Sequence, residues 1–237
     1  MATPTPQPAG SSAEHVVFLL DVDNTLLDND RLKEDLDLRL RKLLGEALAR
    51  QFWAAYEEVR AATGTVDYPL TFERFKGMIP DGERRAALLS LIMEYPFATC
   101  LYPQTMATLA HLRALGQPAI VSDGDTTYQP HKIAQSGLAA AVDWQVVIYT
   151  HKEEHLDEIF ARWPATFYVM VDDKPRILSE VKRLMPQQVV TVQVMQGHYA
   201  TSSEPFSPAP DLTLVGIGDL QRLTLTDLML HLAPSSS

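Results

Sequence analysis

The sequence contains a single cysteine, Cys100, among its 237 residues. A chain with one cysteine cannot form an internal disulfide, and nothing in its cysteine content points to an oxidising compartment. Long hydrophobic runs are missing as well, because runs such as Val16–Leu20 and Val146–Tyr149 are far too short to cross a bilayer. We therefore expect a cytoplasmic protein without a membrane partner.

Positive charge is scarce in this chain. Lysine and arginine number 20 against 30 acidic residues, which gives a formal net charge of −10 and a pI of about 5.1. Such a balance disfavours nucleic acid as a partner, because binding to phosphate backbones needs a basic surface. It also repels phosphorylated ligands at long range, so a phosphate site would need a local cation and backbone amides. A small ligand is the expected partner, and the oligomeric state is left open.

The first residues lack the basic start and the apolar stretch of a secretion signal. Residues 1–14 are rich in proline, threonine, serine and alanine, and we predict that they form a flexible tail. The hydrophobic content of 46% is enough for a packed core in the remainder of the chain.

Short apolar runs rich in β-branched residues recur along the chain, and each is followed by polar residues. Helical stretches lie between most of them, and two end at a glycine: Thr105–Leu115 before Gly116, and Tyr128–Gln135 before Gly137. This alternation predicts an α/β fold, a Rossmann-like parallel sheet with helices on both faces. The predicted strands are 16–20, 118–121, 146–149, 167–171 and 189–194, with 212–217 as an edge strand and 151–163 and 175–185 as further helices.

One interval, residues 30–97, has no convincing strand but several amphipathic helical patterns. We predict that it forms a smaller α-helical cap domain inserted into a core of residues 15–29 and 98–237. Leucines recur at helical spacing over residues 32–61, and Gly45 is the expected break. Further helices are predicted over 72–78 and 83–94.

Polar side chains follow four of the predicted strands where each strand ends. In an open parallel sheet, ligands bind at the carboxyl ends of the strands, so we expect these side chains to lie around one crevice. They are Asp21 and Asp23, the segment Ser122-Asp123-Gly124-Asp125, Lys152, and the pair Asp172-Asp173.

Several aspartates at one crevice could not all stay ionised without a cation, since like charges raise one another's pKa values. Oxygen ligands of this kind favour Mg²⁺. A turn with a glycine and a hydroxyl, such as Ser122-Asp123-Gly124, supplies donors for phosphate oxygens, and Lys152 adds positive charge. The residues therefore predict a magnesium site beside a phosphate site.

These residues resemble the four motifs of the haloacid dehalogenase superfamily. Asp21-Val22-Asp23-Asn24-Thr25 resembles its first motif, Ser122 its second, Lys152 its third and Asp172-Asp173 its fourth. The likeness covers about residues 16–194, and the helical insertion resembles the cap that some members carry after the first motif. It implies that Asp21 is the nucleophile, forming an aspartyl-phosphate, and that Asp23 is the acid and base.

The resemblance also implies the ligand contacts of the site. Substrate phosphate would be bound by Thr25, Ser122, Asp123 and Lys152, with the amide after Ser122 contributing. The metal, Mg²⁺, would be held by Asp21, Asp23, Asp172 and Asp173, of which Asp23 contributes its backbone carbonyl. Whether Asp172 or Asp173 is the main ligand is left open.

A magnesium-dependent phosphatase acting on a small phosphorylated metabolite is the function that the resemblance favours. Dehalogenases that resemble this fold lack an acid at the position of Asp23, so that residue favours phosphate ester hydrolysis. A phosphomutase, a dehalogenase-type member and a non-catalytic module that binds a phospho-ligand or a protein remain alternatives. Lys132 is a rival for the third motif, but Lys152 follows a strand whereas Lys132 lies within a helix. His151 and His155 have zinc-helix spacing but lack the glutamate of that motif.

Overall fold

The computed structural model of the chain describes residues 15–201 and 206–232. The segment predicted to be a flexible tail, residues 1–14, lies outside the described residues. Within the described ranges, no helix is both long and apolar enough to span a membrane.

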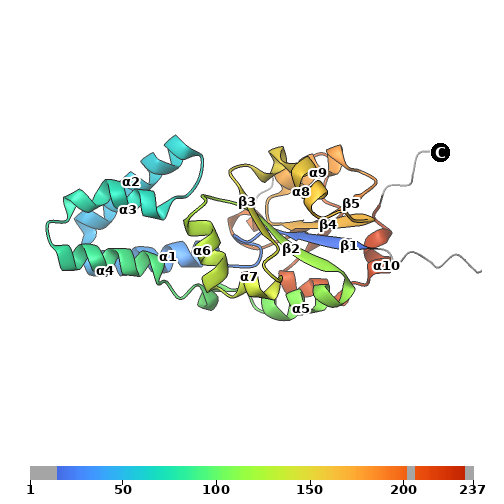
Figure 1. Cartoon of the computed structure of the whole chain (residues 1–237), viewed down its shortest axis with the longest axis horizontal. Helices are drawn as coiled ribbons and strands as arrows, with labels where there is room; N and C mark the ends of the chain where they lie inside the picture. The colour runs from blue at the N-terminus through green and yellow to red at the C-terminus, as the bar shows by residue number, and fades with distance from the viewer. Residues whose placement is uncertain (1–14, 202–205, 233–237) are drawn as a thin grey trace, which may run out of the picture.

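The core is a six-stranded, fully parallel sheet with the strand order β3-β2-β1-β4-β5-β6 (Figure 1). This confirms the predicted sheet, including the edge strand, which pairs with β5. The central strands are completely buried, as their continuous apolar runs require. The strands are β1 (Val16–Leu20), β2 (Gln117–Asp123), β3 (Val146–Tyr149), β4 (Phe167–Asp172), β5 (Val189–Val194) and β6 (Leu212–Leu214).

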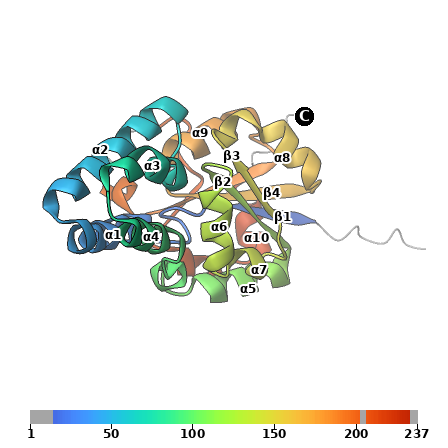
Figure 2. The same ribbon diagram turned by 60° about the vertical axis from the view of Figure 1, so that its left-hand side comes forward.

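Helices cover both faces of the sheet (Figures 1 and 2). Because side chains alternate along a strand, Phe18 and Leu20 pack with α5 (Thr105–Leu115) and α7 (Leu138–Ala141), whereas Leu19 packs with the helices of the opposite face. Those helices are α8 (Leu156–Arg162) and α9 (Pro175–Leu184). Two hydrophobic layers therefore enclose the sheet.

The helical insertion lies between β1 and α5, and we define it as α1 through α4 (Figure 1). Gly45 separates the first two helices, as predicted, and its φ of 82° suits glycine. The insertion has an aromatic centre in which Phe52 meets Trp53 and Phe75 edge to face. Its helices are α1 (Asn29–Leu44), α2 (Glu46–Thr63), α3 (Tyr68–Phe75), the short η1 (Lys76–Met78) and α4 (Gly82–Met93).

One predicted helix, residues 151–163, was wrong in its first turn. The chain instead forms a short 3₁₀ turn, η3 (Lys152–Glu154), and α8 begins only at Leu156. The cause is a tertiary contact, because the backbone N–H of Lys152 donates to the Asp123 carboxylate at 2.9 Å. That bond ties the start of the segment to the end of β2.

The remaining elements connect and cover the sheet edges. Strand order reverses between β1 and β4, which places a crevice at the carboxyl ends of these two neighbours. Helix α6 (Tyr128–Gln135) follows β2 in the chain and contacts Asp23 beside that crevice. The others are η2 (Phe97–Cys100), η4 (His198–Thr201), η5 (Ile217–Arg222) and α10 (Leu225–Met229).

Candidate active site

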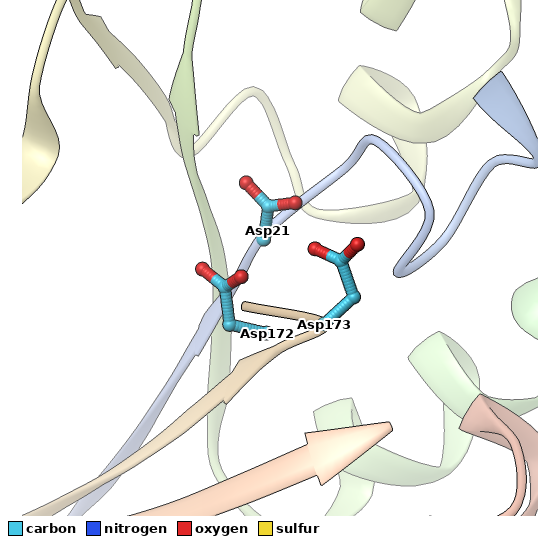
Figure 3. A group of neighbouring side chains, drawn as sticks. All are labelled: Asp21, Asp172 and Asp173. Carbon is cyan, nitrogen blue, oxygen red and sulfur yellow. The ribbon is translucent and has the colours of Figure 1, made fainter. Parts of the chain in front are cut away.

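Three carboxyl groups meet at the ends of β1 and β4 (Figure 3). Asp21 follows β1, Asp172 is the last residue of β4, and Asp173 comes directly after it. One oxygen atom from each lies within 4.8 Å of the others, and all three side chains are buried. The parallel pairing of β1 with β4 brings them together from positions about 150 residues apart.

Lys152 is the cation of this cluster. Its side chain is fully buried, and Nζ lies 2.5 Å from Asp21 Oδ1 and 2.6 Å from Asp172 Oδ2. Nζ also donates to the Val121 carbonyl at 3.3 Å. The structure thus places the predicted Lys152, rather than Lys132, against Asp21.

Burial and charge act in opposite directions on these groups. Burial alone would lower the pKa of Lys152, but Asp172 and Asp21 outweigh it and raise that pKa, so the ammonium stays charged. Burial raises the pKa of Asp21 to about 6, although Lys152 opposes the shift. Burial, reinforced by the neighbouring Asp172 and Asp21, raises the pKa of Asp173 to about 9.

The unpartnered oxygens show what the cluster can bind. Asp21 Oδ2, Asp172 Oδ2 and both carboxylate oxygens of Asp173 are buried without a hydrogen-bond partner among the residues that the structure describes. Asp172 differs in that its Oδ1 accepts from the Lys174 N–H at 2.8 Å and its Oδ2 forms an ion pair with Lys152 at 2.6 Å. A buried, unsatisfied carboxylate is costly, so these oxygens fit a small hard cation such as Mg²⁺.

The turn after β2 contributes two further predicted residues. Ser122 is buried and its Oγ accepts from Gln129 Nε2 at 2.9 Å. Asp123 accepts from the Lys152 amide and, at 3.2 Å, from Lys174 Nζ. Burial alone would raise the pKa of Asp123, but the charges of Lys152 and Lys174 outweigh it and lower that pKa. The Asp123 carboxylate is therefore engaged with lysine groups of the site.

Asp23 lies apart from the three buried carboxyl groups. Its side chain is 29% exposed and borders a cavity of about 180 Å³, to which the insertion contributes Tyr56, Arg60 and Tyr68. Lys132 Nζ lies 2.5 Å from Asp23 Oδ1. The cavity therefore joins a carboxylate of the first motif to residues of the helical insertion.

The rest of the first motif shapes the loop after β1. Asn24 adopts φ of 61°, a left-handed conformation that asparagine tolerates, and its Oδ1 accepts from the N–H groups of Asn29 and Asp30. The loop thereby fixes where α1 begins. Thr25, which was predicted to bind phosphate, is buried inside this loop, and its Oγ1 has no hydrogen-bond partner in the described ranges.

Sequence reasoning missed Lys174 and Gln129 and gave Lys132 no place in the site. Lys174 borders the cavity and contacts Asp123, and its position directly after Asp172-Asp173 was an available signal. Lys132 and Gln129 lie within α6, and no local pattern shows that this face of the helix meets Asp23.

Comparison with solved structures identifies the family. A haloacid dehalogenase-like hydrolase from Burkholderia xenovorans LB400 is 40% identical to this chain, with a TM-score of 0.79 over 89% of this chain and 99% of that one. The chain belongs to the haloacid dehalogenase-like hydrolases. No family model matches it, and no curated protein does either.

More distant structures share the fold. The L-2-haloacid dehalogenase PA0810 is 16% identical, with a TM-score of 0.59 over 88% of this chain and 98% of that one. The hydrolase YfnB from Bacillus subtilis, solved bound to magnesium, is also 16% identical, with a TM-score of 0.55 and the same coverage.

Proposed function

We propose that this protein is a magnesium-dependent phosphatase that hydrolyses a small phosphorylated metabolite through an aspartyl-phosphate on Asp21. The proposal rests on a difference between the two oxygens of the Asp21 carboxylate: Lys152 Nζ lies 2.5 Å from Oδ1, whereas Oδ2 has no hydrogen-bond partner among the described residues. A carboxylate nucleophile needs one free oxygen and a neighbouring positive charge. Asp21 has both.

Phosphoryl transfer begins with attack on phosphorus by a carboxylate oxygen of Asp21. As the new O–P bond forms, the ester O–P bond breaks and the leaving oxygen takes a proton from the Asp23 carboxyl group. Water then attacks the aspartyl-phosphate, and the ionised Asp23 accepts its proton. The second step regenerates Asp21 and releases inorganic phosphate.

Charge on the transferring group must be balanced locally, because the protein as a whole is acidic. Asp173 and the Asp21 oxygen that does not attack phosphorus, assisted by the Asp23 carbonyl, would hold Mg²⁺, which would supply positive charge for the phosphoryl oxygens. Asp172 would be a further ligand of the metal, since its Oδ2 lies in the same group of carboxylate oxygens and also pairs with Lys152 at 2.6 Å. Ser122, the amide after it, Thr25 and Lys152 are the proposed phosphate contacts.

We propose that the helical insertion, residues 30–97, is a cap domain and that residues 15–29 and 98–237 form the core domain. Support comes from the cavity beside Asp23, which Tyr56 and Arg60 of α2 close from the side of the insertion. Hydrolysis of an aspartyl-phosphate requires that water enter in a controlled way. A cap at this position would also select the substrate.

A direct test measures phosphate release from 4-nitrophenyl phosphate, with and without Mg²⁺, for the wild type and Asp21→Asn. We expect turnover only with the metal, and a loss of at least about 10³-fold in the variant. Asp157→Asn, an exposed aspartate on α8, is the matched control and should keep full activity. Turnover that persists without metal or in Asp21→Asn would contradict the mechanism.

Dehalogenation is the competing chemistry, because relatives of this fold include haloacid dehalogenases. Chloride release from 2-chloropropionate, measured on the same preparations, separates the two. The buried, unpartnered Asp173 and the acid Asp23 favour phosphate chemistry. Metal-independent chloride release without any phosphate release would favour a dehalogenase instead.

A further inference from the structure

A second buried lysine lies at the site and is not explained by the four motifs. Lys132 is 3% exposed, and its Nζ lies 2.5 Å from Asp23 Oδ1 and 3.5 Å from Asn29 Oδ1. A lysine is rarely buried unless it is paired, and this one is paired with the carboxylate that borders the cavity. Lys152 and Lys132 therefore serve different aspartates.

Gln129 holds the other oxygen of the same carboxylate. Its Nε2 lies 3.3 Å from Asp23 Oδ2 and 2.9 Å from Ser122 Oγ. Gln129 and Lys132 are three residues apart on α6, so they project from the same face of the helix. One helix face thus contacts both carboxylate oxygens of Asp23.

The turn that follows Ser122 places this face. Asp125 Oδ1 accepts from the N–H groups of Thr127 and Tyr128, which fixes the start of α6. Gly124 lets the helix approach, because a Cβ at that position would lie 2.7 Å from the Cβ of Gln129. Gly124 and Asp125 therefore both act on the placement of α6.

We propose that Lys132 and Gln129 are positioning residues that hold the Asp23 carboxyl group toward the cavity, where it exchanges a proton with the leaving-group oxygen. The inference rests on the phosphatase function proposed above. An aspartate has two rotatable side-chain bonds, and without its two partners its carboxyl group samples orientations that miss the substrate. Small misplacements of a catalytic group cause large losses of rate.

Substrates with different leaving groups test this role. 4-Nitrophenolate leaves without a proton, whereas the alkoxide of an alkyl phosphate such as glycerol 2-phosphate needs one. A positioned acid contributes roughly 10²–10⁴-fold, so Lys132→Met should lower kcat/KM for the alkyl ester by about 10- to 100-fold and for the aryl ester by about 3-fold at most. We compare kcat/KM because it covers the steps up to departure of the alcohol and leaves out the second step, in which Asp23 accepts a proton from water with either substrate. KM should not rise for either substrate. Lys132→Arg should restore part of the alkyl activity.

Lys182→Met is the matched control, because Lys182 is also buried and pairs with Asp211 at 2.9 Å, but lies on α9 outside the site. It should leave the ratio of alkyl to aryl turnover unchanged. Gln129→Leu, which removes the partner of the second oxygen, should change that ratio in the same direction as Lys132→Met. Circular dichroism of each variant checks that it is folded.

Three results would overturn the inference: equal losses on both substrates, a rise in KM with unchanged kcat, or no change at all in Lys132→Met and Gln129→Leu. The second would make Lys132 a substrate contact. Asp21→Asn distinguishes this failure from failure of the phosphatase proposal. If Asp21→Asn is inactive while the leaving-group ratio stays constant, only the positioning role is refuted.

Discussion

Asp173 allows a sharp test of the proposed metal site, because the proposal predicts opposite effects of one substitution on stability and on metal binding. Its side chain is 1% exposed, and both carboxylate oxygens lack a hydrogen-bond partner within the described part of the chain. Asp173→Asn keeps the shape of the group and reproduces its protonated, uncharged form. We expect the variant to be more stable than the wild type without metal and to lose most of the stabilisation by Mg²⁺.

The magnitude follows from the pKa of Asp173, which burial and the neighbouring Asp172 raise from 3.8 to about 9. Asp173 therefore takes up a proton when the chain folds, and the free-energy cost of placing it in the folded state grows as pH rises from 3.8 towards 9. pH 7 lies about three units above the ordinary pKa of 3.8, and each unit corresponds to about 1.4 kcal/mol. The cost of Asp173 to the free energy of folding at pH 7 is therefore at most about 4 kcal/mol. Relaxation around a buried charge reduces such costs, so we expect Asp173→Asn to gain about 2 kcal/mol.

Urea unfolding in the presence of a chelator measures this difference. The free energy of unfolding of the wild type should fall between pH 5 and pH 8, because the folded state binds the proton more tightly than the unfolded state. The gain from Asp173→Asn should therefore be smaller at pH 5 than at pH 8. Asp157→Asn, at an exposed position, should change the free energy of unfolding by less than about 0.5 kcal/mol at either pH.

Added Mg²⁺ should reverse the order of stability. A ligand at 100 times its dissociation constant stabilises the folded state by about 2.7 kcal/mol, and the wild type should show a gain of this size. Asp173→Asn, with one ligand fewer, should show little. If the variant were less stable than the wild type without metal, and both gained equally from Mg²⁺, the reasoning on Asp173 would be refuted.

Two further predictions concern the buried cation and the insertion. Lys152→Met leaves Asp21 and Asp172 buried without their cation, so we expect the free energy of unfolding, measured with urea in the absence of metal, to fall by about 3–5 kcal/mol. The variant should also release no phosphate, even with added Mg²⁺. A free energy of unfolding within about 1 kcal/mol of the wild type would contradict this prediction. Phe52→Ala removes the completely buried centre of the insertion and should cost about 3–5 kcal/mol in the same assay. Leu38→Ala, on the exposed side of α1, is its control and should change the free energy of unfolding little. Equal losses of unfolding free energy in the two variants would show that the insertion is not packed around Phe52.

Much of the fold was predictable because its signals are local. A buried parallel strand has a mainly apolar sequence, and the predicted runs at 16–20 and 189–194 coincide with the buried strands β1 and β5. The run at 146–149 coincides with the half-buried β3. The break at Gly45 was predictable for the same reason, since a glycine interrupts an otherwise regular helical pattern. The helix predicted over 151–163 was wrong only in its first turn, where the Lys152 N–H donates to the distant carboxylate of Asp123.

Part of the site was also predictable. In a parallel sheet the carboxyl ends of all strands lie on the same side. The positions of Asp21, Lys152 and the Asp172-Asp173 pair after predicted strands were therefore enough to predict that they lie close together. The roles of Asp172 and Asp173 were not separable, because adjacent residues at a strand end point in different directions. Only the packed structure shows that Asp172 faces Lys152 while Asp173 keeps both oxygens free.

The amino-acid sequence by itself determined the succession of strands and helices along the chain and the presence of the helical insertion, because both depend on local periodicity. It also determined which carboxylates lie at the carboxyl ends of the strands, because that follows from the parallel topology. Tertiary structure decided which charges meet. The spacing of Gln129 and Lys132 puts them on one helix face, but only the packing of α6 against the loop after β1 shows that this face meets Asp23. Contacts of this kind depend on the relative placement of elements far apart in the chain, which no local pattern encodes.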